Sequence, residues 1–307
     1  MIINECNQKA VVIVGPTGVG KTELALKLMS NIFEIVSCDS VQVYKYLNIG
    51  SGKPNEETLK NFPHHLIDVV NPDEEYSAGD FVRDAVDISK NIAKKGKIPL
   101  FVGGTGMYID SLFKGISEIP KISSEIRQFV KNELEIYGSE LLYSKLEKID
   151  PEYAIKIHCK DKQRIIRALE VYKATGKPFS FFHSKPGVTE NFEALFIGLM
   201  CERPELVNLI NKRVDTMIDN GLIDEVENLR KMGYGPSLKS QMTIGYKEIH
   251  SYLDGKIDKD SAIEEIKSKT RKYAKRQMVW FRKNNSINWF YLRDFQKIND
   301  KIKDFIE

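Results

Sequence analysis

The residues with the clearest chemical potential run from Gly15 to Thr22 and read Gly-Pro-Thr-Gly-Val-Gly-Lys-Thr. This G-x-x-x-x-G-K-T pattern is typical of a phosphate-binding loop, called the P-loop below. A strand, a glycine turn and a helix N-terminus in this order direct backbone N–H groups and the positive end of a helix dipole at one anion. Lys21 adds a mobile positive charge, and Thr22 offers a hydroxyl to Mg²⁺. The sequence predicts a phosphate site formed by Gly15, Pro16, Thr17, Gly18, Val19, Gly20, Lys21 and Thr22.

Asp39 is the second candidate, because it follows the apolar segment Phe33–Cys38 and should reach the same edge of the fold. A carboxylate beside a phosphate site can bind Mg²⁺ or act as a general base. The alternative is a structural role, as a cap for the segment that follows. The next residues are rich in donors, acceptors and one aromatic ring, which suits recognition of a base edge or a hydroxylated substrate: Ser40, Val41, Gln42 and Tyr44.

A glycine-rich segment, Gly103–Gly106, ends the apolar run that starts at Ile98. Glycines at the end of a strand let another backbone or a flat ligand approach closely. A turn with tight helix packing is the alternative. Many P-loop nucleoside triphosphatases carry an Asp where this strand ends in glycine, and Asp68 is only a weak substitute. Hydrolysis of a nucleoside triphosphate is therefore less favoured.

Three arginines could hold phosphate groups. Arg164 and Arg167 are three residues apart on one predicted helical face, although Glu170 could pair with them on a plain surface helix. Arg213 precedes an amphipathic segment that ends near Val226, and an arginine there could bind a phosphate in a bidentate manner. The pair His64–His65 has no third ligand at metal spacing, which favours a structural role.

The elements that must position these residues alternate between strands and helices in the first hundred residues. This alternation predicts a parallel sheet with helices on both faces and a ligand crevice at the carboxyl ends of its strands. The P-loop, Asp39 and the glycine segment should meet there. The predicted strands are Ala10–Val14, Phe33–Val36, His65–Val70, Ile98–Gly103 and Ala194–Leu199, and the predicted helices of this part are Thr22–Met29, Glu56–Asn61 and Ser77–Lys94.

From about Gly115 the pattern changes to helical segments, Ile119–Leu146 and Asp161–Thr175, with no strand between them. We therefore expect an α/β fold with a P-loop-type core, a parallel sheet flanked by helices, and an inserted all-helical domain. The core is assigned to residues 1–115 and 195–307, and the insertion to residues 116–194. After Glu202 the chain is predicted to be mostly helical to its end.

The predicted helix Ser261–Lys283 has two different faces. One face is an apolar stripe of Ile263, Ile266, Tyr273, Ala274, Met278 and Phe281, which should pack on the core. On another face Lys267, Arg271 and Lys275 recur every four residues, with Lys272 and Arg276 beside them. The range from Lys267 to Lys283 contains no glutamate, and its cations are Lys267, Lys269, Arg271, Lys272, Lys275, Arg276, Arg282 and Lys283. A solvated surface is one interpretation. The cations with Tyr273 and Trp280 nearby favour a nucleic-acid phosphate backbone.

Composition sets outer bounds on the protein class. The chain has 307 residues, 42% hydrophobic and 29% charged, with a net charge of +3. No apolar run approaches the ~20 residues of a membrane span, and few residues precede the first strand, so a cytoplasmic protein without membrane attachment is expected. Four scattered cysteines, Cys6, Cys38, Cys159 and Cys201, make neither a zinc site nor a disulfide framework.

Taken together and in this order, the motifs resemble the tRNA dimethylallyltransferase family. The resemblance covers nearly the whole chain and is of the bacterial type, without the zinc-finger tail of eukaryotic relatives. It departs from the usual pattern at Ser51-Gly52, Asp80 and Val279. Besides the P-loop, the segments that resemble the family are 37–44, 48–54, 63–68, 76–81, 102–108, 164–171, 244–248 and 270–277.

The resemblance implies that the P-loop holds the diphosphate of dimethylallyl diphosphate, although the motif often attracts an ATP-binding label. Asp39 would accept a proton from the exocyclic amine of the adenine 3′ to the anticodon, in tRNAs that read codons beginning with U, as that nitrogen attacks the prenyl group. Diphosphate would leave, stabilised by Lys21, Arg213, Thr22 and a Mg²⁺ ion at Thr22.

The resemblance also implies the surface that meets the anticodon stem-loop of tRNA. The residues are Asp39, Ser40, Val41, Gln42, Thr105, Arg127, Gln163, Arg164, Ile165, Ile166, Arg167, Arg271, Lys272, Lys275 and Arg276. A monomer is expected. Three alternatives remain open: a prenyltransferase acting on free AMP, a P-loop small-molecule kinase, and a non-catalytic RNA-binding module, the last of which has no use for a P-loop beside Asp39.

Overall fold

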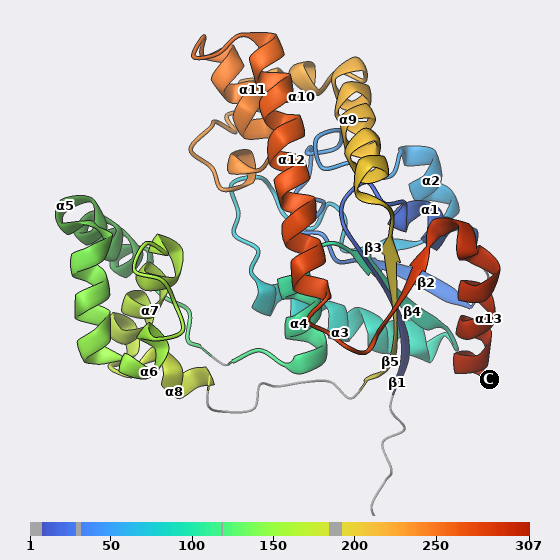
Figure 1. Cartoon of the computed structure of the whole chain (residues 1–307), viewed down its shortest axis with the longest axis horizontal. Helices are drawn as coiled ribbons and strands as arrows, with labels where there is room; N and C mark the ends of the chain where they lie inside the picture. The colour runs from blue at the N-terminus through green and yellow to red at the C-terminus, as the bar shows by residue number, and fades with distance from the viewer. Residues whose placement is uncertain (1–7, 29–31, 118, 184–191) are drawn as a thin grey trace, which may run out of the picture. The chain divides into compact units, whose positions relative to one another are not determined.

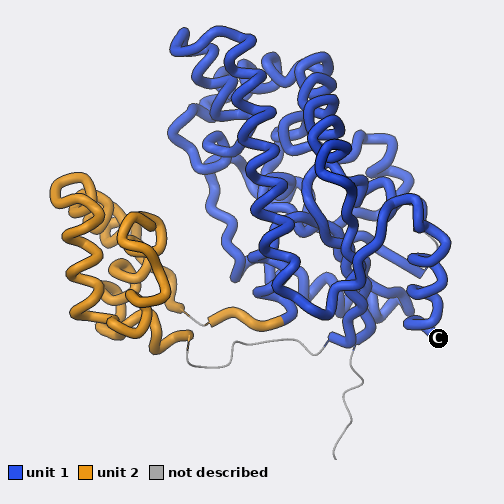
Figure 2. Tube along the Cα trace, in the orientation of Figure 1, with its two compact units in different colours: residues 1–113, 191–307 blue, residues 114–190 orange. Residues whose placement is uncertain are grey.

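The computed structural model describes residues 8–28, 32–117, 119–183 and 192–307. It contains two compact units, Met1–Phe113 with Asn191–Glu307, and Lys114–Glu190 (Figure 2). Within the described ranges, no helix is both long and apolar enough to span a bilayer. Cys38, Cys159 and Cys201 are free thiols, and Cys6 lies outside the described residues.

The first unit is built on a six-stranded sheet in which every strand pair is parallel, as the sequence predicts (Figure 1). The strand order is β3-β2-β4-β1-β5-β6. β1 lies between two neighbours and is buried on both faces, which explains its unbroken apolar run at Ala10–Val14. The bounds are β1 Gln8–Val14, β2 Phe33–Ser37, β3 His64–His65, β4 Ile98–Gly103, β5 Phe192–Met200 and β6 Ile287–Tyr291.

Helices cover both faces of this sheet. Val12 of β1 belongs to a buried cluster with α3 and α4, whereas Val11 and Ile13 belong to a second cluster with α1 and α13. The alternation follows from the two-residue period of a strand. The helices are α1 Lys21–Leu28, α2 Glu56–Asn61, α3 Ala78–Lys94, α4 Gly106–Lys114 and α13 Phe295–Ile306, with a 3₁₀ turn, η2, at Leu292–Asp294.

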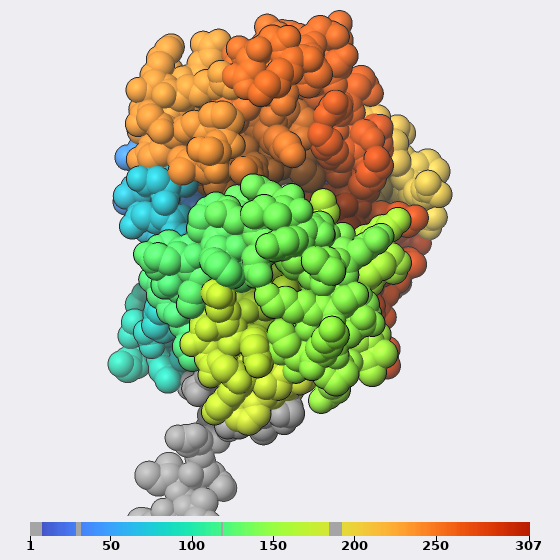
Figure 3. Space-filling model, turned by 90° about the vertical axis from the view of Figure 1, so that its left-hand side faces the viewer, coloured from blue at the N-terminus to red at the C-terminus, as the bar shows by residue number. Residues whose placement is uncertain are grey.

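A group of helices beyond the sheet forms a third core with the loop that follows β2. Its buried members include Tyr44 and Leu47 of the loop, Val214, Val226 and Tyr246. In the space-filling view, α10, α11 and the start of α12 form one continuous orange surface (Figure 3). The bounds are α9 Arg203–Asp219, α10 Leu222–Lys231, η1 Ser240–Met242, α11 Tyr246–Leu253 and α12 Lys259–Phe281.

The second unit is helical and has its own core, which includes Leu142, Leu146 and Ile165. Buried Asp150 joins its parts by accepting hydrogen bonds from the N–H groups of Tyr153 at 3.1 Å and Ser180 at 2.8 Å. The bounds are α5 Ser124–Ile149, which is interrupted at Gly138, α6 Pro151–Ala154, α7 Lys162–Thr175 and α8 Phe179–His183.

One strand prediction is wrong, and one short strand was not predicted. The strand expected at His65–Val70 is limited to His64–His65, because Leu66 and Asp68 have φ values of 62° and 56°, which end an extended chain. The chain after Glu202 is mostly helical, as predicted, but Ile287–Tyr291 adds β6 beside β5. Its Ile-Asn-Trp-Phe-Tyr sequence is rich in strand-forming residues.

The glycine segment after β4 serves close packing within the protein. A Cβ at Gly103 would overlap the carbonyl oxygen of Cys38, and a Cβ at Gly106 would overlap the ring of Trp280. Gly103 therefore allows another backbone segment to approach closely, and Gly106 allows a helix to pack tightly; both roles are among those that the sequence left open. The contact at Gly103 brings the end of β4 against the turn that carries Asp39.

We predict that Gly103→Ala lowers stability by about 1–3 kcal/mol, because the added methyl group must push the Cys38 carbonyl aside. Gly235→Ala is the control, since a Cβ there meets nothing within 4 Å. Thermal denaturation should give a clearly lower Tm for Gly103→Ala alone. Equal Tm values for the two variants would contradict the packing argument.

Candidate active site

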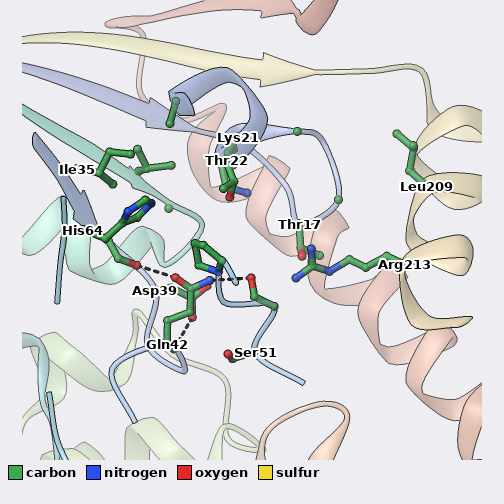
Figure 4. Close-up of a pocket in the computed structure, with 18 residues that line it drawn as sticks. Thr17, Lys21, Thr22, Ile35, Asp39, Gln42, Ser51, His64, Leu209 and Arg213 are labelled. Carbon is green, nitrogen blue, oxygen red and sulfur yellow. Dashed lines mark hydrogen bonds between the residues drawn. The ribbon is translucent and has the colours of Figure 1, made fainter. Parts of the chain in front are cut away.

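A cavity of about 230 Å³ opens at the carboxyl ends of the central strands (Figure 4). The P-loop and the start of α1 form one wall, and the turn after β2 contributes Asp39 and Gln42. Arg213 reaches toward Thr17 from α9 (Figure 4). The predicted meeting of the P-loop and Asp39 at this sheet edge is therefore present.

The P-loop has the conformation that its glycines permit. Gly18 and Gly20 have φ values of 84° and 96°, which side chains rarely tolerate. Lys21 Nζ donates hydrogen bonds to the carbonyl oxygens of Gly15 at 3.0 Å and Pro16 at 2.8 Å. Burial lowers the pKa of Lys21 to about 8; Asp39 opposes this shift, and Arg213 adds to it. Lys21 is thus a desolvated cation held by backbone carbonyls.

Asp39 is fixed by the turn that it starts. Its Oδ1 accepts hydrogen bonds from the N–H groups of Val41 at 2.8 Å and Gln42 at 3.3 Å. The capping role considered above is therefore real, and the same carboxylate also lines the cavity. Thr105 supports the turn, because its Oγ1 accepts a hydrogen bond from the Ser40 N–H at 3.1 Å.

Arg213 lies inside α9, and not before a helix as the sequence suggested. Its guanidinium packs so closely on Gly52 that a Cβ at that position would overlap Nη2. Burial lowers the pKa of Arg213, and Asp39 opposes the shift. Gln42 helps to hold this loop, since its Nε2 donates to the Gly52 carbonyl at 3.2 Å. Arg213 is thereby aimed at the same cavity as Lys21.

A second cavity of about 330 Å³ adjoins the first, and both are lined by Thr17, Asp39, Ser51 and Arg213. The second cavity also has apolar walls, which include Val214, Met217 and Ile266, and cationic and aromatic groups from α12, Arg276 and Tyr273. Asp39 therefore lines both the P-loop cavity and a second cavity whose walls are partly apolar, partly aromatic and partly cationic.

Gln277 is a site residue that the sequence reasoning did not single out. It is buried in α12, its Oε1 accepts the Thr17 N–H at 2.9 Å, and its Nε2 donates to the Gly104 carbonyl at 2.9 Å. It joins the P-loop to the glycine segment. Its sequence position could have revealed it, because Gln277 lies between Ala274 and Phe281 on the side of the helix that otherwise buries apolar residues.

The histidine pair divides between two roles. His65 Nε2 contacts the buried Glu34 carboxylate at 2.9 Å, a structural role as predicted. His64 Nδ1 lies 2.8 Å from the Phe62 carbonyl, and its ring lines the first cavity (Figure 4). Asp68 pairs with Lys53 at 2.6 Å and does not line the P-loop cavity, which agrees with its weakness as a metal ligand.

The basic face of α12 is less uniform than its sequence suggested. Lys267 pairs with Asp215 at 2.8 Å and with Glu264, and Lys269 pairs with buried Glu248 at 2.9 Å. The interpretation of these cations as a face without matching anions is therefore wrong for these two lysines. Arg271 Nη1 donates to Asn211 Oδ1 at 2.6 Å. Apart from Lys259 at its first residue, the exposed cations of the helix and the turn after it are Lys272, Lys275, Arg276, Arg282 and Lys283.

The residues expected to meet tRNA from the helical unit lie on two of its helices. On α7, Arg164 pairs with Asp161 at 2.9 Å and Arg167 with Glu170 at 3.5 Å, as on a plain surface helix. Ile165 is fully buried, so its side chain cannot contact RNA. Gln163 is exposed, Ile166 is half-buried on the same helix, and Arg127 is half-buried on α5.

Comparison with known proteins supports one family. The family model described as IPP transferase matches residues 42–284, and a model described as isopentenyl transferase matches residues 8–69. The chain belongs to the IPP transferase family. It is 44% identical to a tRNA dimethylallyltransferase of Thermoanaerobacter sp. (strain X514), covering 97% of this chain and 96% of that protein. The resemblance inferred from the motifs is confirmed.

Solved structures agree with this assignment. The fold is similar to a full-length tRNA isopentenylpyrophosphate transferase from Bacillus halodurans, with a TM-score of 0.71, 37% identity and 97% coverage of both chains. It is also similar to a eukaryotic dimethylallyltransferase acting on tRNA, with a TM-score of 0.75, 32% identity, and coverage of 90% of this chain and 70% of that one.

We predict that Lys21 contributes less to the affinity for diphosphate as the pH rises. With a pKa of about 8, the Lys21 ammonium is mostly charged at pH 7 and mostly neutral at pH 9, and only the charged form attracts the anion. The measurement is the Kd of inorganic diphosphate for the wild type and Lys21→Gln. The affinity ratio between them should fall severalfold from pH 7 to pH 9. A constant ratio would contradict the assigned role.

Proposed function

We propose that this protein transfers a dimethylallyl group from dimethylallyl diphosphate to the exocyclic amine of the adenine 3′ to the anticodon of tRNA, and releases diphosphate. Family membership supports prenylation of tRNA. The observation that carries the finer proposal is the place of Asp39, which lines both the P-loop cavity and the adjoining mixed cavity. A prenyl diphosphate in the first and an adenine in the second would meet at this carboxylate.

The reaction is a substitution at the first carbon of the prenyl group. The adenine amine nitrogen forms a bond to this carbon, the carbon–oxygen bond breaks, and its electron pair leaves on the diphosphate oxygen. Asp39 accepts the proton that the amine loses, which matters because this amine is a poor nucleophile. Lys21, Arg213 and the N–H groups of the P-loop stabilise the growing negative charge of the leaving diphosphate.

A divalent cation fits this site, and we propose Mg²⁺. No group of three or more His, Cys, Asp or Glu side chains able to hold a metal occurs in the part of the chain that the structure describes. Mg²⁺ is commonly held by one or two protein oxygens together with substrate phosphates and water. Thr22, whose side chain lines the cavity, would supply such an oxygen. When bound, the ion would add positive charge beside the diphosphate.

The acceptor must present an unstacked base to the second cavity. Bases of a single-stranded anticodon loop can be splayed out at modest cost. α12 lines this cavity with Tyr273 and Arg276, and it also carries exposed cations outside the cavity. We propose that the exposed cations of this helix bind the phosphates of the anticodon stem. All proposed groups of this unit come from one chain, so a monomer suffices.

Labelled dimethylallyl diphosphate, offered separately with unmodified tRNA, AMP and ATP, tests this proposal. Label in tRNA alone is the expected result. Label in AMP would favour the free-nucleotide prenyltransferase. Consumption of ATP with a phosphorylated product would favour the kinase, and either of these two results would overturn the proposal.

We predict that Asp39→Asn lowers the rate of transfer by about 10²–10⁴-fold, because the amide cannot accept the proton. The amide oxygen can still accept the N–H groups of Val41 and Gln42, so the turn should persist. Single-turnover rates measure the loss, and tRNA affinity is the control. Near-wild-type turnover of Asp39→Asn would remove Asp39 as the base, whereas Asp39→Ala would also disturb the turn.

We predict that Lys272→Ala with Lys275→Ala weakens tRNA binding and lowers its salt dependence by about one unit of slope for each phosphate that is no longer neutralised. Both residues are exposed and neither lines the cavities described above. Lys267→Ala is the control on the same helix, because Lys267 is already paired with Asp215 and Glu264. If KM for tRNA and the salt slope stay unchanged in the double variant, this face does not bind RNA.

A further inference from the structure

Glu225, on α10, holds the backbone of residues 48–50 by hydrogen bonds that the proposed mechanism does not use. Its Oε2 accepts the N–H groups of Asn48 at 3.0 Å and Ile49 at 2.7 Å, and its Oε1 accepts the N–H of Gly50 at 3.2 Å. Three successive backbone donors thus converge on one carboxylate, as they would on a bound anion. A fourth donor, the Tyr246 hydroxyl, lies 2.7 Å from Oε1.

The captured segment, residues 48–52 or the 48–52 loop, is a wall of both cavities. Gly50 and Ser51 line the second cavity, and Ser51 and Gly52 line the first. The loop is also pinned from behind, because a Cβ at Gly50 would overlap the buried ring of Tyr246. Glu225 and Tyr246 together therefore hold the 48–52 loop in place between the two helices and the cavities.

The 48–52 loop also packs against Arg213. The guanidinium lies directly on Gly52, where no side chain fits, and Gly52 is the last residue of the loop that Glu225 holds. Asp39 lines the same two cavities and influences the pKa of Arg213. A shift of the 48–52 loop would move or loosen this guanidinium relative to the P-loop.

We propose that Glu225 is a positioning residue that acts on diphosphate binding through the 48–52 loop and Arg213. This inference rests on the proposed function, in which Arg213 binds the leaving diphosphate. The Glu225 side chain touches backbone groups and a tyrosine hydroxyl, so any effect on the diphosphate passes through these contacts.

A double-mutant cycle on diphosphate binding tests the proposal, with the Kd of inorganic diphosphate measured in the presence of Mg²⁺. Glu225→Gln should weaken binding about tenfold, because an amide nitrogen replaces one acceptor of the loop N–H groups. In the Arg213→Ala background, Glu225→Gln should weaken diphosphate binding by less than about twofold, because the guanidinium through which Glu225 acts is absent. The Kd for tRNA should stay unchanged, which a general loss of structure would not permit.

Glu227→Gln is the matched control, because two residues along a helix place its side chain on the opposite face; diphosphate affinity should be unchanged. If Glu225→Gln fails to fold, Tyr246→Phe replaces it in the cycle, with a smaller loss of the same pattern. Equal losses in both Arg213 backgrounds, or a loss in tRNA binding instead, would overturn the proposal. A wild-type chain that does not prenylate tRNA would instead refute the proposed function, so the two failures are distinguishable.

Discussion

The site depends on charged groups that are held by backbone and not by one another. Lys21 donates to two P-loop carbonyls, and Asp39 accepts two N–H groups of its own turn. Among the described residues, no ion pair joins Asp39 to Lys21 or Arg213. An ion pair would neutralise these charges and fill the space between them. Because backbone groups hold Lys21 and Asp39 separately, the cavity is lined by an ammonium group and a separate carboxylate.

This separation requires close packing between segments that are far apart in the chain. Gly103 admits the Cys38 carbonyl, Gly52 admits the Arg213 guanidinium, and Gln277 joins the P-loop to Gly104. α12 has a double role in this arrangement, because its buried side supports the P-loop while its other side carries exposed cations. The helix proposed to bind the tRNA stem thus also supports the P-loop, which is the proposed diphosphate site.

The sequence predicted the features that local pattern determines. The P-loop, the parallel sheet and the position of Asp39 follow from short motifs and from strand–helix alternation. The pair Lys267–Glu264 follows from the three-residue spacing within one helix. The pairing of Lys267 with Asp215 and of Lys269 with Glu248, by contrast, could not be predicted, because these acids belong to other helices and meet α12 only through folding. Gln277 and Glu225 escaped notice for the same reason, since their backbone partners lie 173 residues or more away along the chain. β6 was missed because its five residues lie between two helical segments.

We propose that the P-loop of this chain holds a leaving group and not a nucleotide. The most direct measurement is the product stoichiometry of a reaction containing dimethylallyl diphosphate, unmodified tRNA and Mg²⁺, with every nucleoside triphosphate removed. One inorganic diphosphate should be released for each prenyl group that appears on tRNA. A requirement for ATP, or release of ADP or monophosphate in proportion to transfer, would contradict it.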